Sequence, residues 1–229
     1  MTVELDGPRR PPLAGHADSL VVLVHGYGAN GDDLIGLADA WREAMPHTAF
    51  AAPNAPEPLP FTAMGGYQWF DLTLRDPSEL WRGCVAAGPA LDRFVGRELV
   101  RLGLDPARLA LVGFSQGTML ALHIGLRRRV TPAAIVGYSG VIAGPEHLKA
   151  DRHDRSAGDH PRILLVHGEA DDVIPAEALT FSTAALADAG IAVSWHMSPG
   201  LGHGIDAEGM ALGARFLHQA LLPGIRRDS

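Results

Sequence analysis

The chain has 229 residues, 47% of them hydrophobic, and a formal net charge of −7 at pH 7, which allows a sizeable core and gives no electrostatic reason to bind nucleic acid or an anionic membrane. Cys84 is the only cysteine, so an intramolecular disulfide and a thiolate metal cluster are both excluded. The length and the lack of a Pro-, Gly- or Ser-rich linker lead us to expect that residues 1–229 form a single domain. No signal peptide or apolar run of membrane-spanning length is visible, so we expect a cytoplasmic protein without stable membrane association.

Short β-type runs alternate with longer helical patterns, which predicts an α/β fold with a mostly parallel central sheet flanked by helices. The predicted strands are residues 20–24, 48–52, 109–112, 133–138, 163–167 and 192–197. The predicted helices are residues 32–45, 78–102, 116–126, 176–189 and 207–222. Two stretches stand apart: residues 53–71 are rich in Pro and Gly and predict an irregular surface segment, and the polar residues 144–161 predict a flap.

The strand at 109–112 runs into the pentapeptide Gly-Phe-Ser-Gln-Gly at 113–117, and a helical pattern follows it. This arrangement is typical of a nucleophile elbow, in which a sharp turn between strand and helix holds a serine out of the sheet. Glycines at positions 113 and 117 suit such a turn, because a side chain at either would crowd the neighbouring chain. The pentapeptide predicts Ser115 as a nucleophile; the alternative is a small-residue turn in a core.

Two further motifs follow in chain order, each at the end of a predicted strand. His-Gly-Glu-Ala-Asp-Asp at 167–172 places acidic side chains at the edge of the sheet where open parallel sheets bind ligands. Gly-His-Gly at 202–204 presents His203 on a flexible backbone with little packing. The order Ser115, Asp171, His203 is typical of the α/β-hydrolase arrangement of nucleophile, acid and base. Asp172 is the alternative acid.

His-Gly-Tyr-Gly at 25–28 directly follows the strand at 20–24. A glycine-rich turn at this position can direct a backbone amide at the site, and the residue after the nucleophile supplies a second amide. We therefore predict that the backbone N–H groups of Tyr27 and Gln116 form an oxyanion hole. The structural alternative is a tight turn into the next helix, with Asn30 or Asp32 as its cap.

Other side chains near these motifs have less specific interpretations. His25 and His167 each end a strand before a glycine, which favours turn or hydrogen-bond network residues over bases. Trp69 and Phe70 are candidates for lining the acyl or alcohol pocket, and packing in the core explains them equally well. Cys84, in a helical pattern, is expected to be a buried small hydrophobic residue.

Five motifs occur together and in order: HGYGANGDDL at 25–34, WFD at 69–71, GFSQG at 113–117, HGEADDVIP at 167–175 and GLGHGI at 200–205. Over nearly the whole chain they resemble the carboxylesterase/phospholipase family of α/β-hydrolases, which includes the acyl-protein thioesterases. The resemblance implies a minimal cap domain or none, and hydrolysis of carboxylic esters or thioesters by Ser115, Asp171 and His203, with no metal and no cofactor. The family's acid loop usually continues with proline, where this chain has Asp172, and Asp171 matches the family's acid by position.

The function expected from these observations is a serine hydrolase that cleaves small soluble esters or thioesters through an acyl-enzyme. Lysophospholipase or acyl-protein thioesterase activity is the alternative within the same class. An acyltransferase would use the same three residues with another acceptor in place of water, and a non-catalytic binding module is a further alternative. The sequence leaves a homodimer open.

Overall fold

The computed structural model describes residues 4–59, 65–73, 76, 78–150 and 159–222. Within this part of the chain, a seven-stranded main sheet has the order β1-β3-β2-β6-β7-β8-β9. β1 pairs antiparallel with β3, and the other neighbouring strands are parallel. The strands are β1 (Arg9–Arg10), β2 (Ser19–Val24), β3 (Thr48–Ala51), β6 (Leu109–Phe114), β7 (Ala134–Tyr138), β8 (Arg162–Gly168) and β9 (Val193–Ser198).

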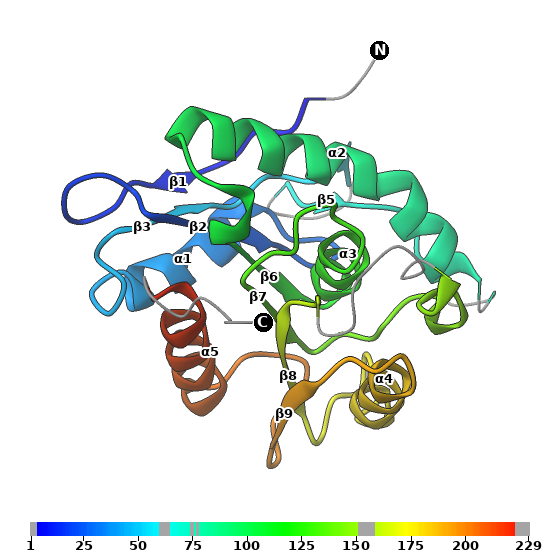
Figure 1. Cartoon of the computed structure of the whole chain (residues 1–229). Helices are drawn as coiled ribbons and strands as arrows, with labels where there is room; N and C mark the ends of the chain where they lie inside the picture. The colour runs from blue at the N-terminus through cyan, green and yellow to red at the C-terminus, as the bar shows by residue number, and fades with distance from the viewer. Residues whose placement is uncertain (1–3, 60–64, 74–75, 77, 151–158, 223–229) are drawn as a thin grey trace.

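Helices cover both faces of this sheet (Figure 1). They are α1 (Gly31–Trp41), α2 (Glu79–Leu102), α3 (Gln116–Gly125), α4 (Glu177–Asp188) and α5 (Ala207–Leu221). One core lies under α2, α3 and α4 and contains Phe94 and Leu120. The other lies under α1 and α5 and contains Trp41 and Leu217. The expected α/β-hydrolase architecture is thus confirmed; among the described residues, no helix is both long and apolar enough to cross a membrane.

The sequence of β2 explains why the sheet is covered on both sides. Leu20 and Val22 point into the core under α2, α3 and α4, whereas Val21 and Leu23 point into the core under α1 and α5. All four side chains are fully buried. A strand that is buried on both faces needs an unbroken apolar run, which is the pattern of a parallel sheet enclosed by helices.

The predicted strands and helices are present, and their ends differ by a few residues. The largest difference is at α1, which ends at Trp41 although an apolar pattern continues to Met45. Backbone N–H groups of Ala44 and Met45 both donate to the carbonyl of Trp41, so the chain turns there. Met45 is still buried, so its apolar character serves the core without being helical.

The interpretation of residues 53–71 as an irregular surface segment was wrong in part. β4 (Glu57–Pro58) and β5 (Tyr67–Gln68) form an antiparallel ribbon, and Trp69 and Phe70 are only 2% and 5% exposed. Residues 60–64 of this segment lie outside the described residues. In the polar segment 144–161, a short 3-10 turn covers Pro145–His147, and residues 151–158 also lie outside the described part of the chain.

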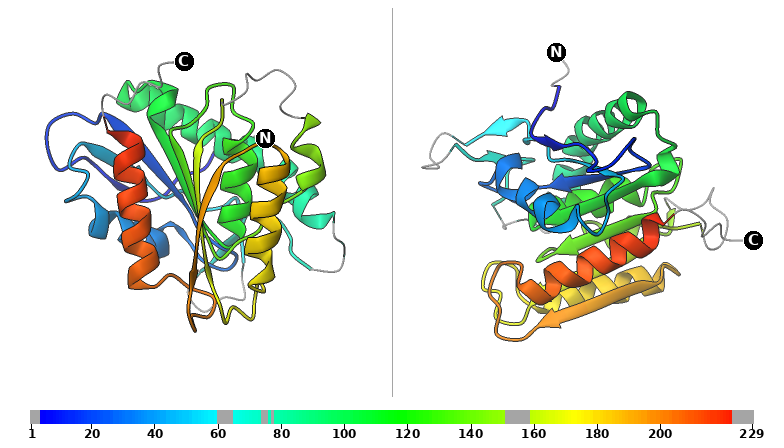
Figure 2. Two further views of the ribbon diagram at one scale, coloured as in Figure 1. Left: turned by 60° about the horizontal axis from the view of Figure 1, so that its bottom comes forward. Right: turned by 90° about the vertical axis from the view of Figure 1, so that its left-hand side faces the viewer.

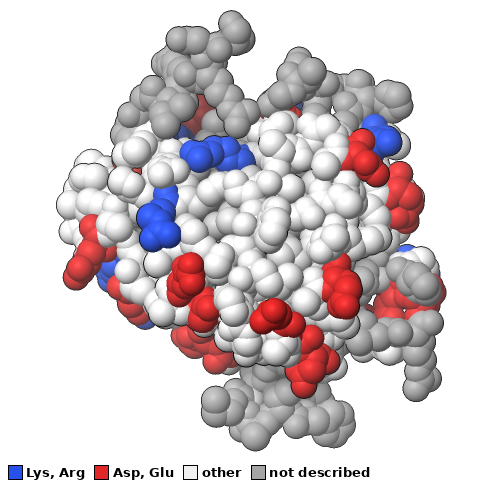
Figure 3. All heavy atoms as spheres, turned by 90° about the horizontal axis from the view of Figure 1, so that it is seen from below, with Lys and Arg blue, Asp and Glu red and all other residues white. Residues whose placement is uncertain are grey.

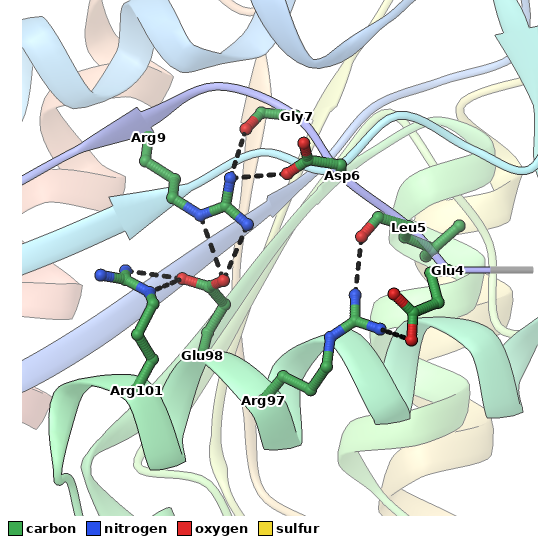
Figure 4. A network of polar contacts seen from close by, with 8 residues as sticks. All are labelled: Glu4, Leu5, Asp6, Gly7, Arg9, Arg97, Glu98 and Arg101. Atoms are coloured by element: carbon green, nitrogen blue, oxygen red, sulfur yellow. Dashed lines mark hydrogen bonds and ion pairs between the residues drawn. The ribbon is translucent and has the colours of Figure 1, made fainter.

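A network of charged side chains fastens the N-terminal segment to α2 (Figure 4). Glu98 is nearly fully buried and accepts hydrogen bonds from Arg9 at 2.8 Å and Arg101 at 2.7 Å. Burial raises the pKa of Glu98, but the hydrogen bonds from these two arginines outweigh it, so the pKa lies below the ordinary value. Glu98 is therefore ionised in the folded protein at neutral pH and compensated by two partners, as a buried charge must be.

The parallel strands place their carboxyl ends at one edge of the sheet (Figure 2). Val24 at the end of β2 pairs with Gly113 of β6, and Gly168 at the end of β8 pairs with Ser198 at the end of β9. The four motifs that begin after these strands therefore start at a common edge. In open α/β sheets this is the edge at which ligands bind.

Candidate active site

Ser115 lies in a strained turn between β6 and α3. Its backbone has φ 55° and ψ −118°, a conformation that residues with side chains rarely adopt. A Cβ at Gly117 would lie 1.9 Å from the carbonyl oxygen of Val24, and one at Gly113 would lie 2.4 Å from that of Gly117. Both glycines are thus required by close backbone approach, as predicted. The backbone N–H of Ser115 donates to the carbonyl of Tyr138 at 2.9 Å, which ties the turn to β7.

The turn after β2 packs directly against Ser115. A Cβ on Gly26 would lie 3.2 Å from Ser115 Cβ, so Tyr27 follows at the point where the two turns meet. Among the described residues, the backbone N–H groups of Tyr27 and Gln116 donate no hydrogen bond to the protein. They are the two donors that the sequence predicts for an oxyanion hole, and they are available to a ligand.

The cap interpretation of the same turn also holds. The Asn30 side chain accepts from the backbone N–H groups of Asp32 and Asp33, and the Asp33 carboxylate accepts from the N–H of Asn30. This capping box begins α1. Asn30, and not Asp32, is the cap, and its contacts do not use the amide of Tyr27.

Trp69 and Phe70 support the turn that carries Ser115 from the core side. The Trp69 backbone N–H donates to Gln116 Oε1 at 3.0 Å, and Gln116 Nε2 donates to the carbonyl of Phe70 at 2.8 Å. The Trp69 indole N–H donates to the carbonyl of His25 at 2.9 Å. The ring of Phe70 packs against the backbone at Gly83 of α2. These are contacts of core residues, and they favour the core-packing interpretation over the pocket-lining one.

Asp171 and His203 form a hydrogen-bonded pair after β8 and β9. His203 Nδ1 donates to Asp171 Oδ2 at 2.8 Å, and Asp171 Oδ1 accepts the backbone N–H groups of Val173 and Ile174 at 3.0 and 2.9 Å. Burial raises the pKa of Asp171, but the hydrogen bonds from His203, Ile174 and Val173 outweigh it, so the pKa lies below the ordinary value. Asp172, the alternative acid, is exposed, and the partner of His203 is Asp171.

The imidazole of His203 lies beside the turn that carries Ser115. Its ring centroid is 4.9 Å from that of Phe114, the residue before Ser115, and its side chain is 18% exposed. Ser115 Oγ and His203 make no hydrogen bond with each other in this structure. Such catalytic hydrogen bonds are often long in ligand-free enzymes and tighten when substrate binds.

Ser139, which none of the sequence motifs contains, holds the loop that carries His203. It directly follows β7, has φ 46°, and is fully buried. Its hydroxyl donates to the carbonyl of Gly204 at 3.2 Å, next to His203. The available signal was a Ser-Gly pair immediately after a predicted strand at the ligand-binding edge.

The histidines at strand ends belong to hydrogen-bond networks, as expected. His25 is buried, its Nδ1–H donates to the carbonyl of Gly26 at 2.7 Å, and its Nε2 accepts the backbone N–H of Ala55 at 3.0 Å. Burial lowers the pKa of His25, so it is neutral. His167 Nε2 lies 2.8 Å from the carbonyl oxygen of Ile174.

Cys84 is buried, and burial raises the pKa of its thiol to about 12. It is a packing residue and not a nucleophile. Among the described residues, no group of three or more His, Cys, Asp or Glu side chains is placed to hold a metal ion. The groups gathered at this edge of the sheet are a hydroxyl, an imidazole, a carboxylate and two backbone amides.

Comparison with known proteins agrees with this set of groups. The family model described as Phospholipase/Carboxylesterase matches residues 13–221. Acyl-protein thioesterase 1 of Gibberella zeae is 28% identical over 93% of this chain and 94% of its own length. Acyl-protein thioesterase 1 of Saccharomyces cerevisiae is 32% identical over 69% of this chain and 73% of its own length.

Solved structures are similar over almost the whole length. The crystal structure of esterase PE8 is 41% identical, with a TM-score of 0.87 over 96% of this chain and 100% of its own. Acyl-protein thioesterase 2 of Zea mays is 25% identical, with a TM-score of 0.72 over 94% of this chain and 98% of its own.

Proposed function

The chain belongs to the phospholipase/carboxylesterase family and is a serine hydrolase of carboxylic esters or thioesters, and from this premise we propose that Ser115, His203 and Asp171 are its catalytic triad. The observation that carries the proposal is the 2.8 Å hydrogen bond between His203 Nδ1 and Asp171 Oδ2. It lies beside a serine in a strained turn, and the carboxylate is fully buried. A buried carboxylate fixes both the tautomer and the orientation of an imidazole that must accept a proton at Nε2.

The proposed reaction has two stages. Ser115 Oγ attacks the acyl carbon while His203 Nε2 takes the hydroxyl proton, and the N–H groups of Tyr27 and Gln116 bind the oxyanion. His203 then gives the proton to the departing oxygen or sulfur, and an acyl-enzyme remains on Ser115. Water attacks this acyl-enzyme with His203 as base, which releases the carboxylic acid and restores the hydroxyl. Asp171 stabilises the imidazolium that forms in each stage.

We propose small, soluble acyl esters as the substrates. The name of the structure that is 41% identical, esterase PE8, supports this choice. Deacylation of S-acylated proteins is the second candidate, and the name acyl-protein thioesterase 1 of the curated relatives supports it. Both candidates use the same groups, so pocket shape and leaving group distinguish them and the triad does not.

A fluorophosphonate probe tests the proposed triad, because an activated serine attacks phosphorus and an ordinary serine does not. We expect one adduct, at Ser115, in the folded protein. Ser115→Ala should abolish labelling and lower turnover by at least about 10³-fold. Peptide mapping that finds the adduct at another serine, or none in folded protein, overturns the assignment. Matched oxygen and sulfur esters, together with an S-acylated peptide, then separate the two substrate classes.

We propose the cytoplasm as the location and a second copy of this chain as the macromolecular partner. Edge strand β9 carries no Asp, Glu, Lys or Arg, and Trp195 on it and Phe181 on α4 are 61% and 52% exposed. Figure 3 views the face that carries β9, α4 and α5; it has a broad uncharged centre with acidic side chains along its lower rim. A strand edge without charge is a template for pairing with another strand.

Charge complementarity favours an antiparallel pair of β9 strands. Arg162 lies just before Ile163, which pairs with the first residue of β9, and Glu169 lies just after Gly168, which pairs with the last. A two-fold axis across β9 therefore brings the basic end of one copy to the acidic end of the other. Light scattering should find a dimer that Trp195→Lys converts to a monomer. A monomeric unmodified protein at high concentration overturns this proposal.

A further inference from the structure

Asp171 is contacted by two histidines and not by one. His203 Nδ1 donates to Asp171 Oδ2 at 2.8 Å, and His167 Nε2 lies 3.3 Å from the same oxygen. His167 comes from β8, whereas His203 comes from the loop after β9, so the carboxylate sits between two imidazoles from different elements. The side chain of His167 is only 1% exposed, and that of Asp171 is fully buried.

Hydrogen bonding fixes the protonation of His167. A carbonyl oxygen only accepts, so the 2.8 Å contact with Ile174 requires a proton on Nε2. Nδ1 is buried and has no hydrogen-bond partner among the described residues. A proton there would leave a buried N–H without a partner, which is costly. The hydrogen bond thus directs an Nε2–H of His167 at the turn that holds the acid.

This N–H closes a ring of contacts around the acid turn. Asp171 Oδ1 accepts the N–H of Ile174 at 2.9 Å, and the carbonyl of Ile174 accepts from His167. The turn that bears the acid is thus attached to β8 through His167. The positive end of the Nε2–H also lies beside Asp171 Oδ2, the oxygen that His203 uses.

We propose that His167 is a positioning residue for the catalytic acid: its Nε2–H holds the Asp171–Ile174 turn and competes with His203 for the charge on Asp171 Oδ2. The inference rests on the proposed triad. The consequence is a weaker hold of the carboxylate on the proton of the His203 imidazolium. His167 thereby keeps the base neutral, and competent, at lower pH than Asp171 alone would allow.

Few other charged groups face this pair in the described part of the chain. Glu169 is in the same loop, and its carboxylate accepts the N–H of Gly200. Asp206 caps α5 by accepting the N–H of Gly209. His196 of β9 lies 4.0 Å from Glu208. None of these contacts involves His167, so we attribute a shift in the pH profile of a His167 variant to Asp171.

The test compares His167→Leu, which removes the N–H, with His167→Gln, whose amide can restore a donor. His218→Gln, on the exposed end of α5, is the matched control. Because the base must be neutral, we expect the acid limb of kcat/KM in His167→Leu to move upward by about half a pH unit or more, and kcat to fall about tenfold with KM nearly unchanged. His167→Gln should keep most of the activity and the original limb.

Proton NMR gives a readout that loss of packing does not imitate. The Nδ1 proton of His203 in its bond to Asp171 should give a downfield signal that vanishes in His203→Ala. The signal should move in His167→Leu and return toward its original position in His167→Gln. An acid limb and a signal that are the same in His167→Leu as in the unmodified protein overturn the inference. A Gln variant as impaired as the Leu variant, with no recovery of the limb, also overturns it.

Two measurements keep the inference separate from folding and from the triad. If His167→Leu does not fold, ¹⁵N shifts of the unmodified protein decide. Nε2 of His167 should carry a proton over the pH range of the acid limb of kcat/KM, and an Nε2 without a proton overturns the inference. Fluorophosphonate labelling of Ser115 in the same samples tests the triad independently. Normal labelling with an unshifted limb rejects only the role of His167, whereas absent labelling of the unmodified protein rejects the triad itself.

Discussion

The side-chain oxygen of Gln116 accepts the backbone N–H of Trp69 at 3.0 Å, so the residue after Ser115 is hydrogen-bonded to the segment that follows β5. The same side chain donates to the carbonyl of Phe70. Gln116 thus has two functions in one residue: its backbone N–H is a proposed oxyanion donor, and its side chain fixes where that N–H lies. This explains why Trp69 and Phe70 are buried close to the site.

Replacing Gln116 with Met should test this positioning. Met has a similar volume but makes neither hydrogen bond, and it leaves two buried backbone groups, on Trp69 and Phe70, unpaired. We expect kcat to fall about tenfold or more, because small displacements of an oxyanion donor are costly, with a smaller change in KM. Gln219→Met, on the exposed surface of α5, should leave both parameters unchanged. A kcat equal to that of the control contradicts the positioning role.

The strained backbone of Ser115 makes a prediction about stability. With φ 55° and ψ −118°, the turn stores strain that a glycine would relieve, and such strain costs about 1 to 3 kcal/mol. Glycine also loses about 0.5 to 1 kcal/mol more entropy on folding than alanine. Ser115→Gly should therefore be more stable than Ser115→Ala by about 1 kcal/mol in urea denaturation. Both variants should be inactive, and equal stabilities would argue against stored strain.

The alternation of strands and helices could be predicted because each parallel strand is an apolar run with turn residues at its ends. The proposed triad residues Ser115 and His203 could be located because each lies in a glycine-containing motif that follows a strand. The elements that were missed are short or polar: β1 consists only of Arg9 and Arg10, and no periodicity can be read from two residues. The place of β1 in the sheet depends on the hydrogen bonds between Arg9 and Glu98.

Contacts between motifs could not be predicted, because they depend on how loops meet in space. The choice between two adjacent carboxylates was one such case, and it is the burial of Asp171 against the exposure of Asp172 that distinguishes them. The proximity of His167 to Asp171 was another. The four-residue spacing between them places both on one side of a helix, but in a loop it has no fixed meaning. Ser139 lay in a motif too short to be distinctive.

The acid assignment is tested by paired substitutions. Asp171→Asn removes the charge that stabilises the imidazolium and allows the wrong tautomer, so turnover should fall by about 10³-fold or more. Asp172→Asn, one position further and exposed, should retain nearly full turnover. His203→Ala should abolish turnover and leave the fold intact by circular dichroism. Reversed effects of the two asparagine variants would move the acid to Asp172.

Glu98 should make stability depend on pH in a defined direction. Its folded pKa lies below the ordinary value of 4.5, so the ionised carboxylate stabilises the fold fully above that value and progressively less as pH falls through the folded pKa. Glu98→Gln should reduce the free energy of unfolding by about 1 to 2 kcal/mol at neutral pH. The difference should narrow below pH 4.5. A difference in the free energy of unfolding between the unmodified protein and Glu98→Gln that stays constant down to acid denaturation contradicts this role of the Glu98 charge.

Substitutions of Arg9 and Arg101 should separate the contribution of the Glu98 charge from that of the two arginines around it. Arg9 is 33% exposed and Arg101 52% exposed at the side chain, so each can return to water when Glu98 is neutral. Replacing one arginine by methionine leaves the other to compensate the carboxylate. The free energy of unfolding should therefore fall less than it does in Glu98→Ala. Chemical denaturation of the three variants at one pH tests this order.

The choice of substrate can be tested by chain length and by leaving group. A buried methylene contributes at most about 0.8 kcal/mol, so kcat/KM should change by no more than about fourfold per added carbon and should discriminate gradually between neighbouring acyl lengths. We expect turnover of p-nitrophenyl butyrate, weak action on emulsified triolein, and no requirement for metal. A preference for emulsified triolein with strong interfacial activation points instead to a true lipase.

Leaving groups probe the second proton transfer. An alkoxide must receive the proton from His203 as it departs, whereas a thiolate or nitrophenolate is stable enough to leave without it. Variants that weaken the hold of Asp171 on the imidazolium should therefore impair alkyl esters more than thioesters of the same acyl group. Because both form the same acyl-enzyme on Ser115, any difference between them arises in acylation. If deacylation limits both reactions, the two esters will share one kcat and differ only in kcat/KM. The comparison is therefore made on kcat/KM. Equal losses of kcat/KM for the oxygen and sulfur esters would argue against His203 as the general acid.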